Sequence, residues 1–200
     1  MTTHKLYSIG YATKPIEVFI GHLRQYDISA VADVRSVPYS RAFYDYNRET
    51  LEATLKAASV HYVFLGDKLG PRSKNDAHYD ELGQVQFDRL MRSILFLNGI
   101  ERVQTGIEKG MCIALMCAEK DPVDCHRSLL IAYHLQRQCG IAVQHIRHDG
   151  ELESQAALEA RLVNLHNAGG DLFSTPEELV ELAWQKQVRL KAYRRPPDLK

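Results

Sequence analysis

The sequence predicts an α/β protein with a mainly parallel, open sheet of about five strands, helices on both faces and a C-terminal helical extension. Three observations support this prediction. Short β-branched or apolar runs alternate with amphipathic stretches at helical spacing. No tight turn joins these runs, and parallel strands need a crossover connection between them. The run from Met111 to Ala118 is apolar throughout, which is typical of a central strand buried on both faces.

The first part of the chain repeats a strand followed by a helix. A strand is predicted from Lys5 to Gly10, and Pro15 opens a helix whose apolar residues recur at helical spacing. A second strand is predicted from Ser29 to Val34. Asn47 is a suitable N-cap for the next helix, and the β-branched and aromatic content of Val60 to Leu65 predicts a third strand.

The middle of the chain contains a long turn and then resumes the alternation. Residues 66–83 form a turn long enough to be interpreted as a binding loop or lid. A helix is predicted from Gln84 to about Leu97, and the strand that starts at Met111 follows it. A helix beginning near Cys125 then leads to a fifth strand candidate from Ile141 to Ile146.

From Glu151 onward the pattern is helical. Leu152, Leu158, Leu162 and Leu165 predict one helix, and Thr175-Pro-Glu-Glu178 is a capping box for another that reaches roughly Leu190. We therefore expect an α/β domain over residues 1–150, C-terminal helices packed on it over 151–193, and a flexible tail over 194–200.

Composition sets further limits. The chain has 200 residues and equal numbers of basic and acidic side chains, so it has no global field that attracts a polyanion. Nucleic acid therefore remains a possible partner that the net charge does not indicate. The four cysteines lack C-x-x-C spacing, which predicts reduced thiols. Without a signal peptide or an apolar run of ~18 residues, we expect a cytoplasmic protein with no membrane segment. Neither a cofactor nor an oligomeric state is indicated.

The candidate site lies at the carboxyl ends of the predicted strands, where ligands bind in open parallel sheets. The candidate catalytic residues are Asp33, Glu119, Cys125 and His126, and the candidate anion-binding residues are Gly10, Tyr11, Arg35, Arg41, Arg72 and Arg127. Asp121-Pro122 suits an N-cap and a first helical position. The free N–H groups of a helix start would then lie near His126 and Arg127, where they favour a phosphate or carboxylate.

Each candidate has a structural alternative. Cys125 beside His126 and Arg127 should have a lowered pKa, and yet such a cysteine can simply pack. His126 can act as an acid or base, donate to a phosphate or cap a helix. Glu119 can be a general base or the partner of an arginine, and Asp33 and Arg35 can be a mutual ion pair.

No metal site is predicted. His145 and His148 are three residues apart but fall near a strand end rather than on a helix. Cys117, Cys125 and His126 could supply three soft ligands, although no second spaced cysteine pair supports that interpretation. Cys112 and Cys117 are interpreted as small core residues of a buried strand.

Three motifs in order resemble a known family. They are Ser8-Ile-Gly-Tyr11, then Asp33-Val-Arg35 with Pro38, Ser40, Arg41 and Leu69-Gly70, and above all Cys117-Ala-Glu-Lys-Asp-Pro-Val-Asp-Cys125-His126-Arg127. Over about residues 5–148 the chain resembles the domain-of-unknown-function family numbered 488. Ser8 stands where that family usually has threonine, and Ala12 removes any hydroxyl at its position. The resemblance implies a shared α/β fold and a shared site, and no particular reaction.

The leading hypothesis is an enzyme or enzyme-like domain that acts on a phosphorylated, nucleotide-like or nucleic-acid ligand. It depends on acid/base and anion-binding groups converging at one edge of the sheet. One alternative is a sulfur-transfer or redox protein with Cys125 as nucleophile. The other is a non-catalytic binding module, in which residues 66–83 and the C-terminal helices form a partner surface.

Overall fold

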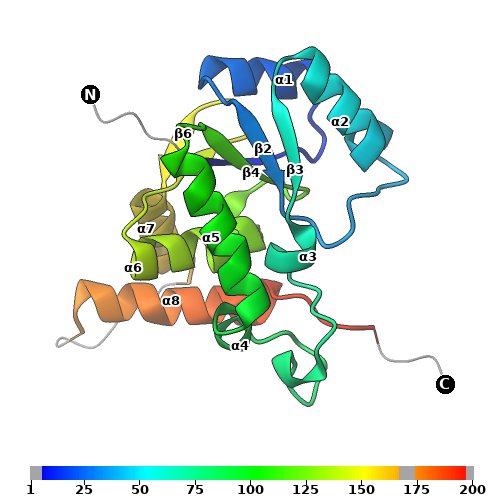
Figure 1. Cartoon of the computed structure of the whole chain (residues 1–200). Coiled ribbons are helices and arrows are strands. Elements are labelled where there is room, and N and C mark those ends of the chain that lie inside the picture. The colour runs from blue at the N-terminus through cyan, green and yellow to red at the C-terminus, as the bar shows by residue number, and fades with distance from the viewer. Residues whose placement is uncertain (1–5, 167–173, 197–200) are drawn as a thin grey trace.

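A single sheet forms the centre of the protein (Figure 1). The structure is a computed structural model, and it describes residues 6–166 and 174–196. Within these residues the strands are β1 Leu6–Gly10, β2 Ala30–Asp33, β3 His61–Phe64, β4 Ile113–Cys117, β5 Gln144–Ile146 and β6 Leu152–Ser154. Their order across the sheet is β3-β2-β4-β1-β5-β6. The first five are parallel, and β6 runs antiparallel to β5. The predicted α/β class with a mainly parallel sheet is confirmed.

The sixth strand is an addition to the predicted sheet. Leu152 belongs to β6, whereas its apolar character had assigned it to a helix. The chain reverses between β5 and β6 because the Arg147 amide donates to the Glu151 carbonyl and Gly150 adopts a φ of 91°. Asp149-Gly150 is a common turn dipeptide, so the hairpin had a sequence signal.

Helices α1 (Ile16–Gln25) and α2 (Arg48–Ala57) cover one face of the sheet. Phe19, Leu23, Leu51 and Leu55 are buried there at the helical spacing the sequence predicted. The predicted cap at Asn47 is wrong in one respect. Asn47 does precede α2, but its side-chain oxygen accepts a hydrogen bond from the Ser40 amide instead of from the helix.

The other face is covered by the remaining long helices, α5, α6, α7 and α8. Their bounds are Ile94–Glu108, Tyr133–Cys139, Gln155–Leu165 and Pro176–Lys191. The helix predicted over 84–97 is instead two helices, α4 (Phe87–Met91) and α5. The break occurs because the Ser93 hydroxyl accepts a hydrogen bond from the Phe96 amide and so begins a new helix.

The segment 66–83 is more ordered than a plain turn. It contains α3 (Gly66–Leu69) and a 3₁₀ turn, Asp76–His78. Gly70 lies so close to the Ser36 side chain that an added Cβ would be 2.3 Å from its hydroxyl oxygen. This segment therefore follows the surface of the loop after β2.

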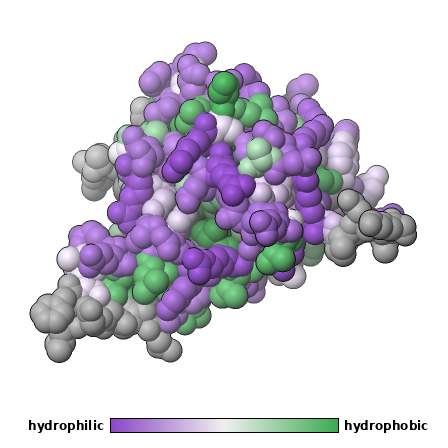
Figure 2. Space-filling model, turned by 90° about the horizontal axis from the view of Figure 1, so that it is seen from below, coloured by the Kyte–Doolittle hydropathy of each residue, from purple (hydrophilic) through white to green (hydrophobic). Residues whose placement is uncertain are grey.

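The C-terminal helices belong to the same buried cluster as the sheet. Trp184 of α8 donates from Nε1 to the Leu129 carbonyl at 2.9 Å, and the predicted capping box at Thr175 and Glu178 is present. Figure 2 shows the underside, where α8 lies, as largely hydrophilic with hydrophobic side chains in separate groups. Arg195 pairs with Asp76, whereas residues 197–200 of the expected tail lie outside the described residues.

None of the described helices combines the length and apolar composition that a bilayer-spanning segment requires.

Candidate functional site

The loops after β1 and β4 lie against each other at the carboxyl edge of the sheet. The Tyr11 amide donates to the Cys117 carbonyl at 3.2 Å, and the Ala12 amide donates to the Ala118 carbonyl at 2.8 Å. An added Cβ on Gly10 would be 1.9 Å from the Glu119 carbonyl oxygen. Gly10 therefore permits a close backbone approach, a different role from the anion contact that its sequence position suggested.

Asp33 and Arg35 form a buried bidentate ion pair. The guanidinium donates to the carboxylate from Nε at 2.9 Å and from Nη2 at 2.6 Å. Tyr62 also donates to the Asp33 carboxylate, and Arg35 donates to the Tyr11 hydroxyl. Asp33 and Arg35 thus direct these hydrogen bonds to each other and to neighbouring tyrosines. This arrangement matches the mutual ion pair, which the sequence left open as the alternative to a role in ligand binding.

Four other predicted or considered residues converge into one cluster. Cys117 and Cys125 each donate a hydrogen bond to Oε2 of Glu119, with sulfur-to-oxygen distances of 2.9 and 3.0 Å. Nδ1 of His126 lies 3.6 Å from the Cys117 sulfur and 3.8 Å from the Cys125 sulfur. Both cysteines and His126 are buried, whereas Glu119 is exposed. We call these four residues the Cys–Glu–His cluster.

Local structure explains why the cluster forms. Cys117 and Glu119 are two residues apart at the end of β4, so they point to the same side. Asp121 caps the 3₁₀ turn Pro122–Asp124 by accepting from the Val123 amide, which confirms the predicted cap. The turn brings Cys125 back to Cys117, and a π-helical turn, Arg127–Ala132, follows.

The tautomer of His126 follows from its other ring nitrogen. Nε2 lies 2.9 Å from the Val34 carbonyl oxygen, which can only accept, so Nε2 carries the proton. In the neutral ring the lone pair of Nδ1 therefore faces the two thiols. The carbonyl fixes both the proton position and the ring orientation.

Burial and neighbouring groups shift the pKa values of the cluster residues in different directions. Burial raises the pKa of Cys117, and the neighbouring Cys125 raises it further. Although Glu119 is an exposed residue, its carboxyl group lies against the two buried thiols, and this partial loss of solvent raises its pKa. Although burial opposes the shift, the neighbouring Cys117 thiol and the charge of Arg127 hold the pKa of Cys125 well below its ordinary value. Cys125 is thus the more acidic of the two thiols.

Arg127 is a fully buried cation. It donates from Nη1 to the Glu119 carbonyl at 2.8 Å and from Nη2 to the Lys120 carbonyl at 3.3 Å, while its Nε has no hydrogen-bond partner. No carboxylate pairs with it among the described residues. The predicted anion-binding arginine therefore holds the loop after β4 without a direct ion-pair partner, although its charge acts on Asp121 and Cys125.

Lys14 is a second buried cation, which the sequence analysis missed. Only 3% of it is exposed, and its Nζ donates to Nδ1 of His22 at 2.8 Å and to the Arg147 carbonyl at 3.4 Å. Burial and the charge of Arg127 lower the pKa of Lys14 to about 8. The described ion pairs give it no carboxylate partner either.

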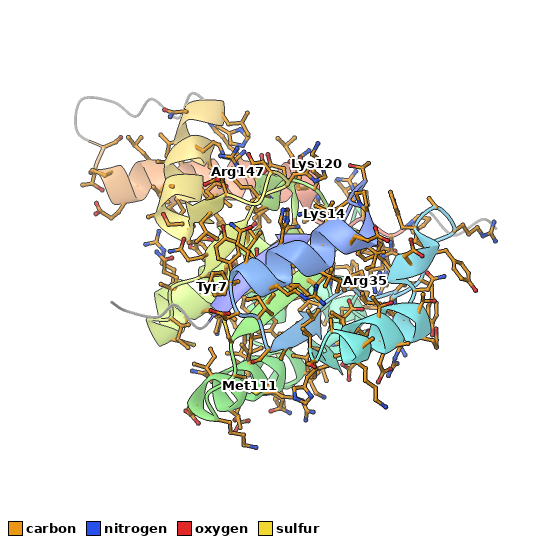
Figure 3. All side chains as sticks on the ribbon, turned by 90° about the horizontal axis from the view of Figure 1, so that it is seen from above. Tyr7, Lys14, Arg35, Met111, Lys120 and Arg147 are labelled. Atoms are coloured by element: carbon orange, nitrogen blue, oxygen red, sulfur yellow. The ribbon has the colours of Figure 1, made fainter. Side chains whose placement is uncertain are left out.

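A cleft of about 810 Å³ opens beside Glu119. Its wall consists of loop residues after β4 and β5 together with residues of β6 and α7: Glu119, Lys120, Asp121, Pro122, Asp124, Arg147, His148, Asp149, Glu153 and Arg161. Lys14, Lys120 and Arg147 come from three separate loops and lie on the same side of the molecule (Figure 3). Nδ1 of His148 is buried and has no hydrogen-bond partner among the residues that the structure describes. We call this the strand-end cleft.

The other two predicted arginines lie elsewhere. Arg41 is exposed in the loop after β2. Arg72 stacks on the Tyr193 ring and lines a separate cleft of about 890 Å³ with residues of α3 and α5. His145 uses both ring nitrogens, one with Ser8 and one with Gln155, so it is not free to bind a ligand.

The Cys–Glu–His cluster lies entirely within a segment that matches one family model. The model is described as "Domain of unknown function DUF488" and matches residues 15–134, more than half of the chain. The chain belongs to the DUF488 family. Among curated proteins and solved structures, none matches it significantly. Gly10, Tyr11 and Lys14 lie outside the DUF488 match, as does the cleft wall contributed by residues 147–161.

Proposed function

We propose that this DUF488 protein is an enzyme-like domain that binds a small phosphorylated ligand in the strand-end cleft. The observation that supports the proposal best is a pair of buried cations, Lys14 and Arg127, behind the cleft wall without a carboxylate partner. Burying an unpaired charge is costly, so proteins normally pair it. A bound anion would supply the missing negative charge.

The two cations also repel each other. The charge of Arg127 contributes to the lowered pKa of Lys14, so the two lie close enough to interact. An anion near both would be attracted by each and would reduce their repulsion. Phosphate suits this setting because its several acceptor oxygens can use donors such as Arg127 Nε and His148 Nδ1, both buried and unpartnered.

The wall of the strand-end cleft carries more acidic than basic side chains, so its attraction for an anion would come from the buried cations behind it, Lys14 and Arg127. Arg72 and its basic neighbours Lys68, Lys74 and Arg92 line the second cleft at the surface, where solvent already stabilises charge. In the strand-end cleft, exposed Lys120 adds a positive group for which no acidic partner is found among the described residues. The Cys–Glu–His cluster also borders this cleft through Glu119, whereas none of its four residues lines the second cleft.

A binding experiment tests the proposal. The full-length protein is titrated by calorimetry with inorganic phosphate, a nucleoside monophosphate and a short oligonucleotide, in a buffer free of other polyvalent anions. We expect binding of at least one of them. Changing Lys120 to alanine should weaken it by about ten-fold, the size expected from losing a charge-assisted contact.

Lys56→Ala is the matched control, since Lys56 is an exposed lysine of α2 and its loss changes the net charge equally. This variant should bind as the wild type does. Absence of binding by all three probes, or equal weakening in the Lys56 and Lys120 variants, would refute a specific site. Preference for the oligonucleotide over the monophosphate would identify the ligand as a nucleic acid.

A further inference from the structure

We propose that the Cys–Glu–His cluster is a zinc site, with Cys117, Cys125 and His126 as buried ligands and Glu119 as the fourth. Its four donor atoms are two sulfurs, one imidazole nitrogen and one carboxylate oxygen, and all lie within 4.8 Å of one another. Zinc binds these three donor types and prefers four ligands. The sequence did not predict a metal site because its cysteines are not arranged in spaced pairs.

The separations of the donors fit tetrahedral zinc. With Zn–S of about 2.3 Å and Zn–N of about 2.0–2.1 Å, tetrahedral geometry separates sulfur from nitrogen by about 3.6 Å. The observed separations from Nδ1 of His126 are 3.6 Å to Cys117 and 3.8 Å to Cys125. Glu119 is nearer to the sulfurs than a tetrahedral ligand would be, at 2.9 and 3.0 Å. As the exposed member, it is the one that can withdraw.

The surroundings prepare the ligands for a metal. The Val34 carbonyl holds the proton of His126 on Nε2, as metal-ligating histidines usually require, and this leaves Nδ1 for the ion. The Arg127 amide lies 3.5 Å from the Cys125 sulfur and can donate to it. Two thiolates and a carboxylate would outnumber the two charges of zinc by one, and Arg127 lies next to them.

Binding exchanges protons for the ion. Zn²⁺ binds thiolates, so each thiol releases its proton to solvent as its Zn–S bond forms, and no electron is transferred. The hydrogen bonds that both thiols donate to Glu119 are lost at the same time, which frees Oε2 to bind the metal. Among divalent ions, this mixture of two thiolates and one imidazole favours zinc over magnesium, calcium or manganese.

The fourth position faces the strand-end cleft. Three ligands are buried, whereas Glu119 is exposed and lines the cleft. Two cysteines and one histidine with an exchangeable fourth ligand form the arrangement found in catalytic zinc sites, as distinct from closed structural ones. Water or an anion in the cleft could therefore replace Glu119 on the metal.

Cobalt provides the test. The full-length protein is reduced, freed of metal with a chelator and titrated with Co²⁺ under anaerobic conditions, and bound metal is measured by elemental analysis. We expect one ion per chain, with the thiolate-to-cobalt charge-transfer absorption and the strong visible bands of tetrahedral cobalt, both abolished by added Zn²⁺. Cys117→Ser and Cys125→Ser should each reduce the charge-transfer intensity and weaken binding by at least about a hundred-fold.

Cys112→Ser and Cys139→Ser are the matched controls, because both cysteines lie outside the cluster. They should keep the wild-type spectrum. Glu119→Gln should keep the charge-transfer band, because both thiolates remain, and should alter the visible bands, because the fourth ligand changes. Wild-type protein without a thiolate-to-cobalt band would overturn the proposal, as would equal metal content in the Cys125 and Cys139 variants. Phosphate binding is measured on the chelator-treated wild type, so the two proposals can fail separately.

Discussion

Replacing Lys14 by methionine should stabilise the protein at neutral pH. Lys14 is 3% exposed, and the charged or titratable groups that act on it are His22, His148, Arg127 and Asp149. Only Asp149 among them is negative, so the folded state holds an ammonium group at a cost. Methionine has a similar length and carries no charge, so it should remove that cost.

The pKa of Lys14 gives the magnitude. Burial and Arg127 lower it from 10.5 to about 8, which corresponds to about 3 kcal/mol at about 1.4 kcal/mol for each pKa unit. Below pH 8 the lysine is charged in both states and the full cost is present. Between pH 8 and 10.5 the unfolded state binds more protons, so the free energy of unfolding of the wild type rises with pH. The advantage of the variant should therefore shrink across that interval.

Urea unfolding at several pH values between 7 and 10.5 measures the effect, in chloride buffers without phosphate. The difference between Lys14→Met and wild type should be about 3 kcal/mol at pH 7 and close to zero at pH 10.5. Lys56→Met, at an exposed lysine of α2, controls for the loss of one charge. A variant that is less stable than wild type at pH 7, or a difference that does not change with pH, would refute the reasoning.

Three other substitutions test the fold around the site. Gly10→Ala should destabilise the protein by about 1–3 kcal/mol in chemical unfolding, because its Cβ would be 1.9 Å from the Glu119 carbonyl oxygen. The control is Gly21→Ala, in an open position of α1, which should instead stabilise the protein by up to about 1 kcal/mol. Asp33→Asn should cost about 3–5 kcal/mol by leaving Arg35 buried without its carboxylate, compared with less than about 1 kcal/mol for Asp67→Asn at a surface pair. Burial lowers the pKa of His145 to about 4, so the wild type should lose about 3 kcal/mol as the pH falls from 6.5 to 4, and His145→Gln should lack that loss.

Each of these has a contradicting outcome. Equal changes at Gly10 and Gly21 would mean that the loops after β1 and β4 separate freely. A cost at Asp33 no larger than at Asp67 would mean that Arg35 reaches water. An unchanged acid dependence in His145→Gln would assign the loss of stability to other groups.

The strands were predictable because a strand that is buried in the sheet consists mainly of apolar residues. The run from Met111 to Ala118 predicted a central strand covered on both sides, and β4 lies between β2 and β1. The helix break at Ser93 was missed because the apolar period continues across it. A single hydroxyl that caps a helix does not interrupt such a period.

The sequence predicted which residues belong to the candidate site better than it predicted which of them contact one another. Glu119, Cys125 and His126 were selected because they follow a buried strand. The spacing of two residues already put Cys117 on the same side as Glu119, but the sequence could not place Cys125 and His126 against them, since that depends on the path of the turn at Pro122–Asp124. Lys14 carries no pattern of its own. Its burial results from the approach of the loop after β5, which is distant in sequence.

The position of β1 in the sheet determines where an expressed fragment of this protein should begin. The DUF488 match starts at residue 15, yet β1 ends at Gly10 and lies between β4 and β5 in the sheet. A fragment limited to the matched residues would leave the apolar β4 as an unprotected edge, and such edges promote aggregation. We therefore expect the matched segment to aggregate when it is expressed alone, and its recombinant expression should include both the preceding strand and the C-terminal helices.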